Sequence, residues 1–235
     1  MTASQVFDFS FVKTDISVET VARYFGGSRY TINEKTSARI HRCINAACKL
    51  VYPKATYTIF PVSSIIPGKE IVLEDGLRVL LPECFDAPGT QLIAAIIGTL
   101  GERLEKECRE LAGNGEIYES TLFDAVGTVM LDLLSAKICA IIEKVGSKDG
   151  LVKGARFAPG IDGYPLEQQH LLFKIADNES VAVFLNSSAI MVPTKSISFF
   201  MVLTDTLGKK ETKNKCGLCR LQNCQFRKVV IKDNF

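Results

Sequence analysis

The segment KEIVLEDGLRVLL, residues 69–81, reads as two short strands joined by a tight turn. Apolar residues recur along both halves, and the Asp75-Gly76 pair between them is a strong hairpin signal. Residues 55–62, ATYTIFPV, read as a further strand just before it. Hairpins pair neighbouring strands antiparallel, and the chain lacks a clean βαβ rhythm. We therefore expect an α+β domain with a mixed or antiparallel twisted sheet and flanking helices.

Helical signals lie on both sides of this hairpin. Ser17 can cap a helix over residues 16–25, and Gly26-Gly27 can end it. Further helices are predicted over residues 32–50, 91–111, 119–144 and 166–175, with the third apolar on most sides and therefore central. Strands are expected over 180–187 and 195–204, and the Gly- and Pro-punctuated stretch 145–165 predicts a long functional loop.

Charge is spread unevenly along the chain. Of the net charge of +2, residues from 209 onward contribute +6, which leaves −4 for residues 1–208. We predict a domain over 1–206, then a basic linker and Cys-rich tail over 207–235 that is either solvated or docks an acidic partner. The small net charge argues against nucleic acid. No signal peptide or apolar run of about 20 residues is evident, so no membrane contact and a cytoplasmic location are expected.

Two segments carry possible ligand chemistry. Arg156 opens the turn RFAPG, residues 156–160, in which Ala158, Pro159 and Gly160 follow Phe157. A Pro-Gly turn fixes backbone groups, and a planar guanidinium suits a carboxylate. The alternative is a surface turn with a solvated arginine. Residues 185–198, LNSSAIMVPTKSIS, read as strand, loop and strand, for which ordinary half-buried sheet is the simpler interpretation.

The order of these motifs resembles the activation (reactivation) domain of vitamin-B12-dependent methionine synthase, particularly its freestanding members. The RxAPG turn is followed by a proline, a helix and a strand of the form L-[TN]-[ES]-S, and then by P-x-[KA]-S-[VI]-S. The matching residues are Arg156, Ala158, Pro159, Gly160, Pro165, Leu185, Ser188, Pro193, Ser196, Ile197 and Ser198. VARYFGG (21–27) and AAIIGTLGERLE (94–105) also resemble that group, and the likeness covers about residues 15–205.

The resemblance implies an S-adenosylmethionine site. In the family the turn binds this cofactor with the arginine on the methionyl carboxylate, and an acidic helix residue lies near the ligand. Asp132 is the matching position here, in a polar stripe with Asp124, Thr128 and Ser135 that would otherwise face water. Two positions depart from the pattern: Ile161 replaces a tyrosine and Ser187 a glutamate. The implied cofactor-binding residues are Arg156, Ala158, Pro159, Gly160, Asp132 and Ser188.

The resemblance also implies a role beside a partner. Such a domain presents S-adenosylmethionine to cobalamin held on a methionine synthase or other corrinoid protein, for reductive remethylation, with an electron donor such as flavodoxin. The chain itself would be an auxiliary component without catalytic residues. The alternative is a metal or iron–sulfur redox accessory, or a docking protein, of a corrinoid methyltransferase without a retained S-adenosylmethionine site.

A cysteine motif near the end of the chain suggests metal chemistry. Cys216, Cys219 and Cys224 are spaced closely enough to bind Zn2+ or an iron–sulfur cluster, because thiolates are soft ligands. A closed site needs a fourth ligand, for which the candidates are Cys84, Cys43, Cys48 and His41. The alternative is a set of reduced, unligated cysteines. Cys108 and Cys139 fall in predicted helices and are expected to be inert.

Overall fold

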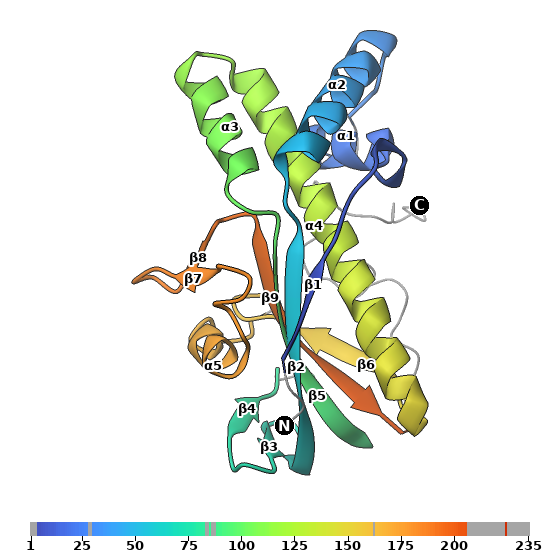
Figure 1. The fold of residues 1–235 in the computed structure, drawn as a ribbon, viewed down its shortest axis with the longest axis vertical. Coiled ribbons are helices and arrows are strands. Elements are labelled where there is room, and N and C mark those ends of the chain that lie inside the picture. The colour runs from blue at the N-terminus through green and yellow to red at the C-terminus, as the bar shows by residue number, and fades with distance from the viewer. Residues whose placement is uncertain are drawn as a thin grey trace, which may run out of the picture. The chain divides into compact units, whose positions relative to one another are not determined.

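The computed structural model describes residues 4–27, 30–82, 85, 88–161, 163–205 and 224 of the 235-residue chain (Figure 1). These residues divide into two compact units. The first comprises residues 4–10, 52–102 and 131–205, and the second comprises 11–51 and 103–130. Helix α4 (Ile117–Gly146) contributes its N-terminal half to the second unit and its C-terminal half to the first. The expected domain boundary at residue 206 stays a prediction.

The first unit is built on a sheet in which every strand pair is antiparallel. The strand order is β4-β3-β2-β5-β9-β6, and β1 lies off this path, paired with the N-terminal part of β2. The strands are β1 (Gln5–Asp8), β2 (Lys54–Ile66), β3 (Glu70–Leu73), β4 (Arg78–Leu80), β5 (Thr90–Thr99), β6 (Val152–Phe157) and β9 (Ser196–Thr204). The predicted α+β class with an antiparallel sheet and flanking helices is confirmed.

The hairpin predicted over residues 69–81 forms as β3 and β4. Gly76 adopts φ +84°, a left-handed conformation that glycine takes without steric cost. The backbone N–H of Leu77 donates to Asp75 Oδ1 over 3.1 Å, which fixes the turn. The Asp-Gly pair therefore supplies both the permissive residue and the side-chain acceptor that the hairpin needs.

The helix predicted over residues 91–111 is wrong. Residues Thr90–Thr99 form strand β5, and only Arg103–Gly113 form a helix, α3. Strand β5 lies between β2 and β9 with nearly all of its residues buried, so it has no polar face to give an alternating pattern. A continuous apolar run of this kind is compatible with either a buried strand or a buried helix.

Two smaller expectations also need correction. The stretch 145–165, expected as a loop, contains strand β6 at the edge of the sheet and a short 3-10 turn, η2 (Ser147–Asp149). Of residues 180–187, only β7 (Phe184–Leu185) is a strand. It pairs with β8 (Met191–Val192) in a separate two-stranded hairpin.

Helices cover both faces of the first unit's sheet (Figure 1). On one face, helix α5 (Gln168–Ile175) places Leu172 in a buried cluster with Phe200, Val202 and other sheet residues. On the other face, the Cα of Gly98 lies so close to α4 that an added Cβ would meet Leu134 and Ile197 at 3.2 Å. Side chains therefore alternate along β9 between the α5 face and the α4 face.

The second unit is helical. It contains a 3-10 turn η1 (Lys13–Asp15), α1 (Val18–Gly26), α2 (Glu34–Leu50), α3 and the first half of α4. The predicted cap is confirmed, because Thr20 N–H donates to Ser17 Oγ over 3.2 Å, and α1 ends at Gly26 with Gly27 as its C-cap. Edge-to-face contacts join Phe25 to Tyr30 and Tyr118, which ties α1 to the start of α4.

Helix α4 corrects the expectation that the chain contains no apolar segment of membrane-spanning length. Residues Ile117–Asp149 contain an 18-residue window of mean hydropathy 1.9, so by length and composition the helix is long enough to cross a membrane. However, 56% of that window is buried inside the protein, as in the core helix of a soluble protein. One such helix is weak support for a membrane span. The cytoplasmic location stays a prediction.

Candidate functional site

The turn after β6 has a defined backbone geometry. Ile161 N–H donates to the Ala158 carbonyl over 3.1 Å, which closes a β-turn with Pro159 and Gly160 at its centre. Gly160 adopts φ +78°, the left-handed value that a type II turn requires at its third position. Gly160 N–H donates onward to the Tyr164 carbonyl over 2.9 Å. The RxAPG segment is therefore a fixed turn rather than an irregular loop.

Tyr164 anchors this turn to the sheet. Its side chain is only 2% exposed, and its hydroxyl donates to the Leu80 carbonyl over 3.0 Å. The ring packs edge-to-face on Phe157, the last residue of β6, with centroids 5.1 Å apart. Burial raises the pKa of Tyr164 well above its ordinary value, so the hydroxyl stays protonated and can donate. The sequence analysis assigned no role to Tyr164, and its position four residues after Gly160 is the signal that could have indicated one.

Arg156 lies on the α4 face of β6, where it has three neighbours. Its Nη1 donates a hydrogen bond to Ser135 Oγ of α4, and its Cζ lies 5.5 Å from the centroid of the Phe199 ring. The third neighbour is the thiol of Cys139, one helical turn after Ser135. Burial raises the pKa of Cys139, and the charge of Arg156 and hydrogen bonds from Arg156 and Ser135 act in the opposite direction.

Asp132 lies on the same helix as Ser135, three residues earlier and therefore on a neighbouring part of its surface. Asp132 and Asp124 are exposed, Thr128 is half-buried and Ser135 is buried. The predicted polar stripe therefore runs from solvent into the sheet contact. The structure places Asp132 near the helical turn that contacts Arg156, and its role in ligand binding stays a prediction.

Ser188 lies in the loop of the β7–β8 hairpin and is exposed. Asn186 Oδ1 accepts from the backbone N–H of Ser188 over 2.9 Å and from that of Ile190 over 3.0 Å, so the loop is organised by Asn186. The hairpin lies on the side of the sheet that carries α5, away from the C-terminal half of α4 (Figure 1). Ser188 and Arg156 are thus on different faces, and a shared site stays a prediction.

The proposed cysteine ligands can be placed only in part. Cys216, Cys219 and Cys84 lie outside the described residues, and Cys224 is a free thiol. Cys43 and Cys48 lie on α2, where burial raises the pKa of both, that of Cys43 to about 11, and so disfavours the thiolate that binds metal. Within the described ranges, no group of three His, Cys, Asp or Glu side chains is close enough to hold a metal ion.

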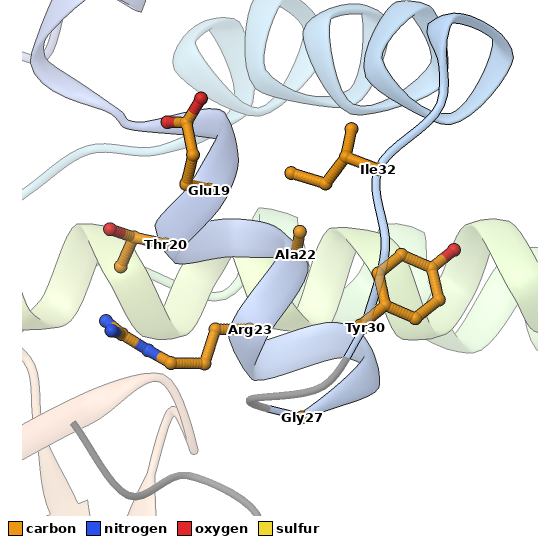
Figure 2. Close-up of a pocket in the computed structure, with 7 residues that line it drawn as sticks. All are labelled: Glu19, Thr20, Ala22, Arg23, Gly27, Tyr30 and Ile32. Carbon is orange, nitrogen blue, oxygen red and sulfur yellow. The ribbon is translucent and has the colours of Figure 1, made fainter. Parts of the chain in front are cut away.

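The second unit contains a surface hollow of about 370 Å³ beside α1 (Figure 2). Arg23 extends from α1 along it, and Tyr30 comes from the segment that follows the helix (Figure 2). The other lining residues are Glu19, Thr20, Ala22, Gly27 and Ile32. None of the residues predicted to bind a ligand lines this hollow.

Comparisons with known proteins identify the architecture. No protein-family model matches the chain, and no curated protein matches it in sequence. The chain shares its α+β fold, an antiparallel sheet with flanking helices, with a solved reactivation domain. One solved structure that it resembles is the crystal structure of the MetH reactivation domain bound to AdoHcy, with a TM-score of 0.63 and 15% identity. The match covers 85% of this chain and 78% of that chain.

Proposed function

We propose that the chain binds S-adenosylmethionine at the turn after β6 and presents its methyl group to cobalamin on a partner protein. The observation that carries the proposal is the position of Arg156, two residues before the fixed turn that begins at Ala158. Ser135 of α4 and the ring of Phe199 hold its guanidinium there. The fold adds support, because the structurally similar MetH domain was crystallised with AdoHcy, which is S-adenosylmethionine after loss of the methyl group.

In this proposal, each residue of the site binds a different group of S-adenosylmethionine. The guanidinium of Arg156 binds the methionyl carboxylate, for which its planar fork of N–H donors is suited. The turn Ala158–Gly160 supplies main-chain groups of fixed direction, and the carboxylate of Asp132 pairs with the ligand's ammonium group. Together these contacts orient the sulfonium so that its methyl group faces outward, which is a contribution of positioning rather than bond chemistry.

The reaction requires components that a partner provides. Cobalamin on the partner would supply the cobalt centre that takes up the methyl group once a donor such as flavodoxin had reduced it by one electron, with S-adenosylhomocysteine as the product. The partner is a methionine synthase or another corrinoid methyltransferase. The chain's own residues bind the methyl donor and keep its direction constant during that transfer.

Isothermal titration calorimetry with S-adenosylmethionine tests the binding step. We expect saturable binding, and a loss of about 10- to 100-fold in affinity for Arg156→Ala, because a hydrogen bond to a charged group contributes about 1.5–3 kcal/mol. Lys49→Ala is the matched control, since it removes an exposed positive charge from α2. Absence of binding at millimolar ligand, or equal affinity in the Arg156→Ala variant, would overturn the proposal.

A reconstitution experiment tests the role beside a partner. A methionine synthase that lacks its own reactivation domain is prepared in the cob(II)alamin form and mixed with this chain, S-adenosylmethionine and reduced flavodoxin. The proposal expects the methylcobalamin absorption spectrum to develop only when wild-type chain is present. A spectrum that develops equally with the Arg156→Ala variant would contradict the assignment of this site.

A further inference from the structure

We infer that Ser135 is a positioning residue that holds the guanidinium of Arg156 ready for a ligand carboxylate. This inference rests on the proposed function, because it assigns a role to a neighbour of the proposed cofactor-binding arginine. No part of the sequence motif includes Ser135, since it lies on α4 and 21 positions before Arg156. The structure is what brings the two residues together.

The contact has the geometry of a fixed support. Ser135 is 7% exposed, so its hydroxyl is held in place by the packing of α4 on the sheet. Arg156 is exposed as a residue, yet its Nη1 donates to this buried hydroxyl and its Cζ lies over Phe199. Together with the neighbouring Cys139 thiol, these contacts anchor the guanidinium, while the residue as a whole stays open to solvent.

The chemistry of serine suits this task. A guanidinium has five N–H donors, and two parallel ones are enough for a carboxylate, so one contact to Ser135 leaves the fork available. The hydroxyl is neutral and accepts the hydrogen bond without cancelling the positive charge. An acidic residue at this position would orient Arg156 equally well but would compete with the carboxylate of the ligand.

We expect a gain in ligand affinity, because the Arg156 side chain loses its conformational freedom when the protein folds and not when the ligand binds. Immobilising a flexible side chain on binding costs about 0.5–1.5 kcal/mol, which corresponds to about 2- to 12-fold in affinity. An arginine that is already oriented avoids most of this loss. We therefore expect Ser135→Ala to weaken S-adenosylmethionine binding by about 2- to 12-fold, less than Arg156→Ala.

The test compares two ligands and five variants by calorimetry. Ser135→Ala should weaken S-adenosylmethionine but leave decarboxylated S-adenosylmethionine unchanged, because only the former has the carboxylate that Arg156 binds. In the Arg156→Ala background, Ser135→Ala should have no further effect, and Ser135→Thr, which keeps the hydroxyl, should restore affinity in the wild-type background. Ser120→Ala is the control, since it removes another α4 hydroxyl, one that donates to the Cys108 carbonyl over 2.8 Å.

The outcomes separate the two proposals. If wild-type protein does not bind S-adenosylmethionine, the proposed function fails. If wild type binds and Arg156→Ala weakens binding while Ser135→Ala equals wild type, the proposed function stands and the positioning role is overturned. Equal loss for both ligands in Ser135→Ala, or a loss matched by Ser120→Ala, would reveal a structural effect and would also overturn the positioning role.

Discussion

Replacing Tyr164 by phenylalanine removes one oxygen atom from a 2% exposed side chain and leaves the ring in place. The lost hydroxyl donates to the Leu80 carbonyl over 3.0 Å and lies 3.3 Å from Gln168 Oε1. A buried acceptor that loses its donor costs about 1–3 kcal/mol. Phenylalanine keeps the edge-to-face packing on Phe157, so no cavity adds to that cost. We expect the free energy of unfolding to fall by about 1–2 kcal/mol at pH 7.

Urea denaturation followed by far-ultraviolet circular dichroism measures this change, and it suits a chain without tryptophan. Tyr52→Phe is the matched control, because it makes the same substitution at a tyrosine that is 54% exposed. In a chain of this size, 1 kcal/mol corresponds to about 2–4 °C in Tm. A free energy of unfolding within about 0.5 kcal/mol of wild type for Tyr164→Phe would refute the anchoring role.

The same variant predicts a pH dependence. Burial raises the folded-state pKa of Tyr164 above the ordinary value of about 10. Between those two pKa values, the folded protein holds a proton that the unfolded chain releases. The stability from this group is therefore complete below pH 10 and lost as pH rises through the folded pKa. The advantage of wild type over Tyr164→Phe should shrink by about 1.4 kcal/mol per pH unit above 10, and a constant difference would contradict this account.

Further predictions concern backbone, core and tail. Gly160→Ala should cost about 1–2 kcal/mol in urea unfolding because of its positive φ, whereas Gly113→Ala, in open space on α3, should stabilise by about 0.5–1 kcal/mol. Phe200→Ala should cost about 3–5 kcal/mol by the same assay, since Phe200 is fully buried against Phe157. Anaerobically purified protein should contain zinc or absorb visible light through a cluster, and a colourless, metal-free preparation would remove metal binding by Cys216, Cys219 and Cys224.

Local signals predicted much of the fold because each of them acts over a few residues. Ser17 caps α1 and Asp75-Gly76 turns the β3–β4 hairpin, as expected from the sequence. The apolar segment 119–144 lies within α4, which has buried positions in both units. The cap and the hairpin turn depend on hydrogen bonds and backbone conformations within a few residues, so the residue types alone predict them.

The error at residues 91–111 has a different physical origin. Ile93, Ile96 and Ile97 are buried in a central strand with partners on both edges, and those partners come from residues far along the chain. A strand covered on both faces loses the alternation that distinguishes it from a helix, and only β-branched side chains then favour the strand. The boundary was nevertheless marked, because Gly101 adopts φ +77° between β5 and α3. The isoleucines before Gly101 favour a strand there, and the glycine separates it from the helix.

In the candidate site, too, the locally determined features could be predicted from the sequence and the long-range contacts could not. The RxAPG turn was visible because its constraint is local: proline fixes one φ and glycine permits the next. Ser135 was noted only as one member of a polar stripe, although it is the buried member and the one that contacts Arg156. A hydroxyl in the middle of an apolar helix costs free energy unless a partner satisfies it. Such a partner can be the carbonyl four residues earlier in the same helix or a group on a neighbouring element, so the sequence alone does not identify Arg156 as the partner of Ser135.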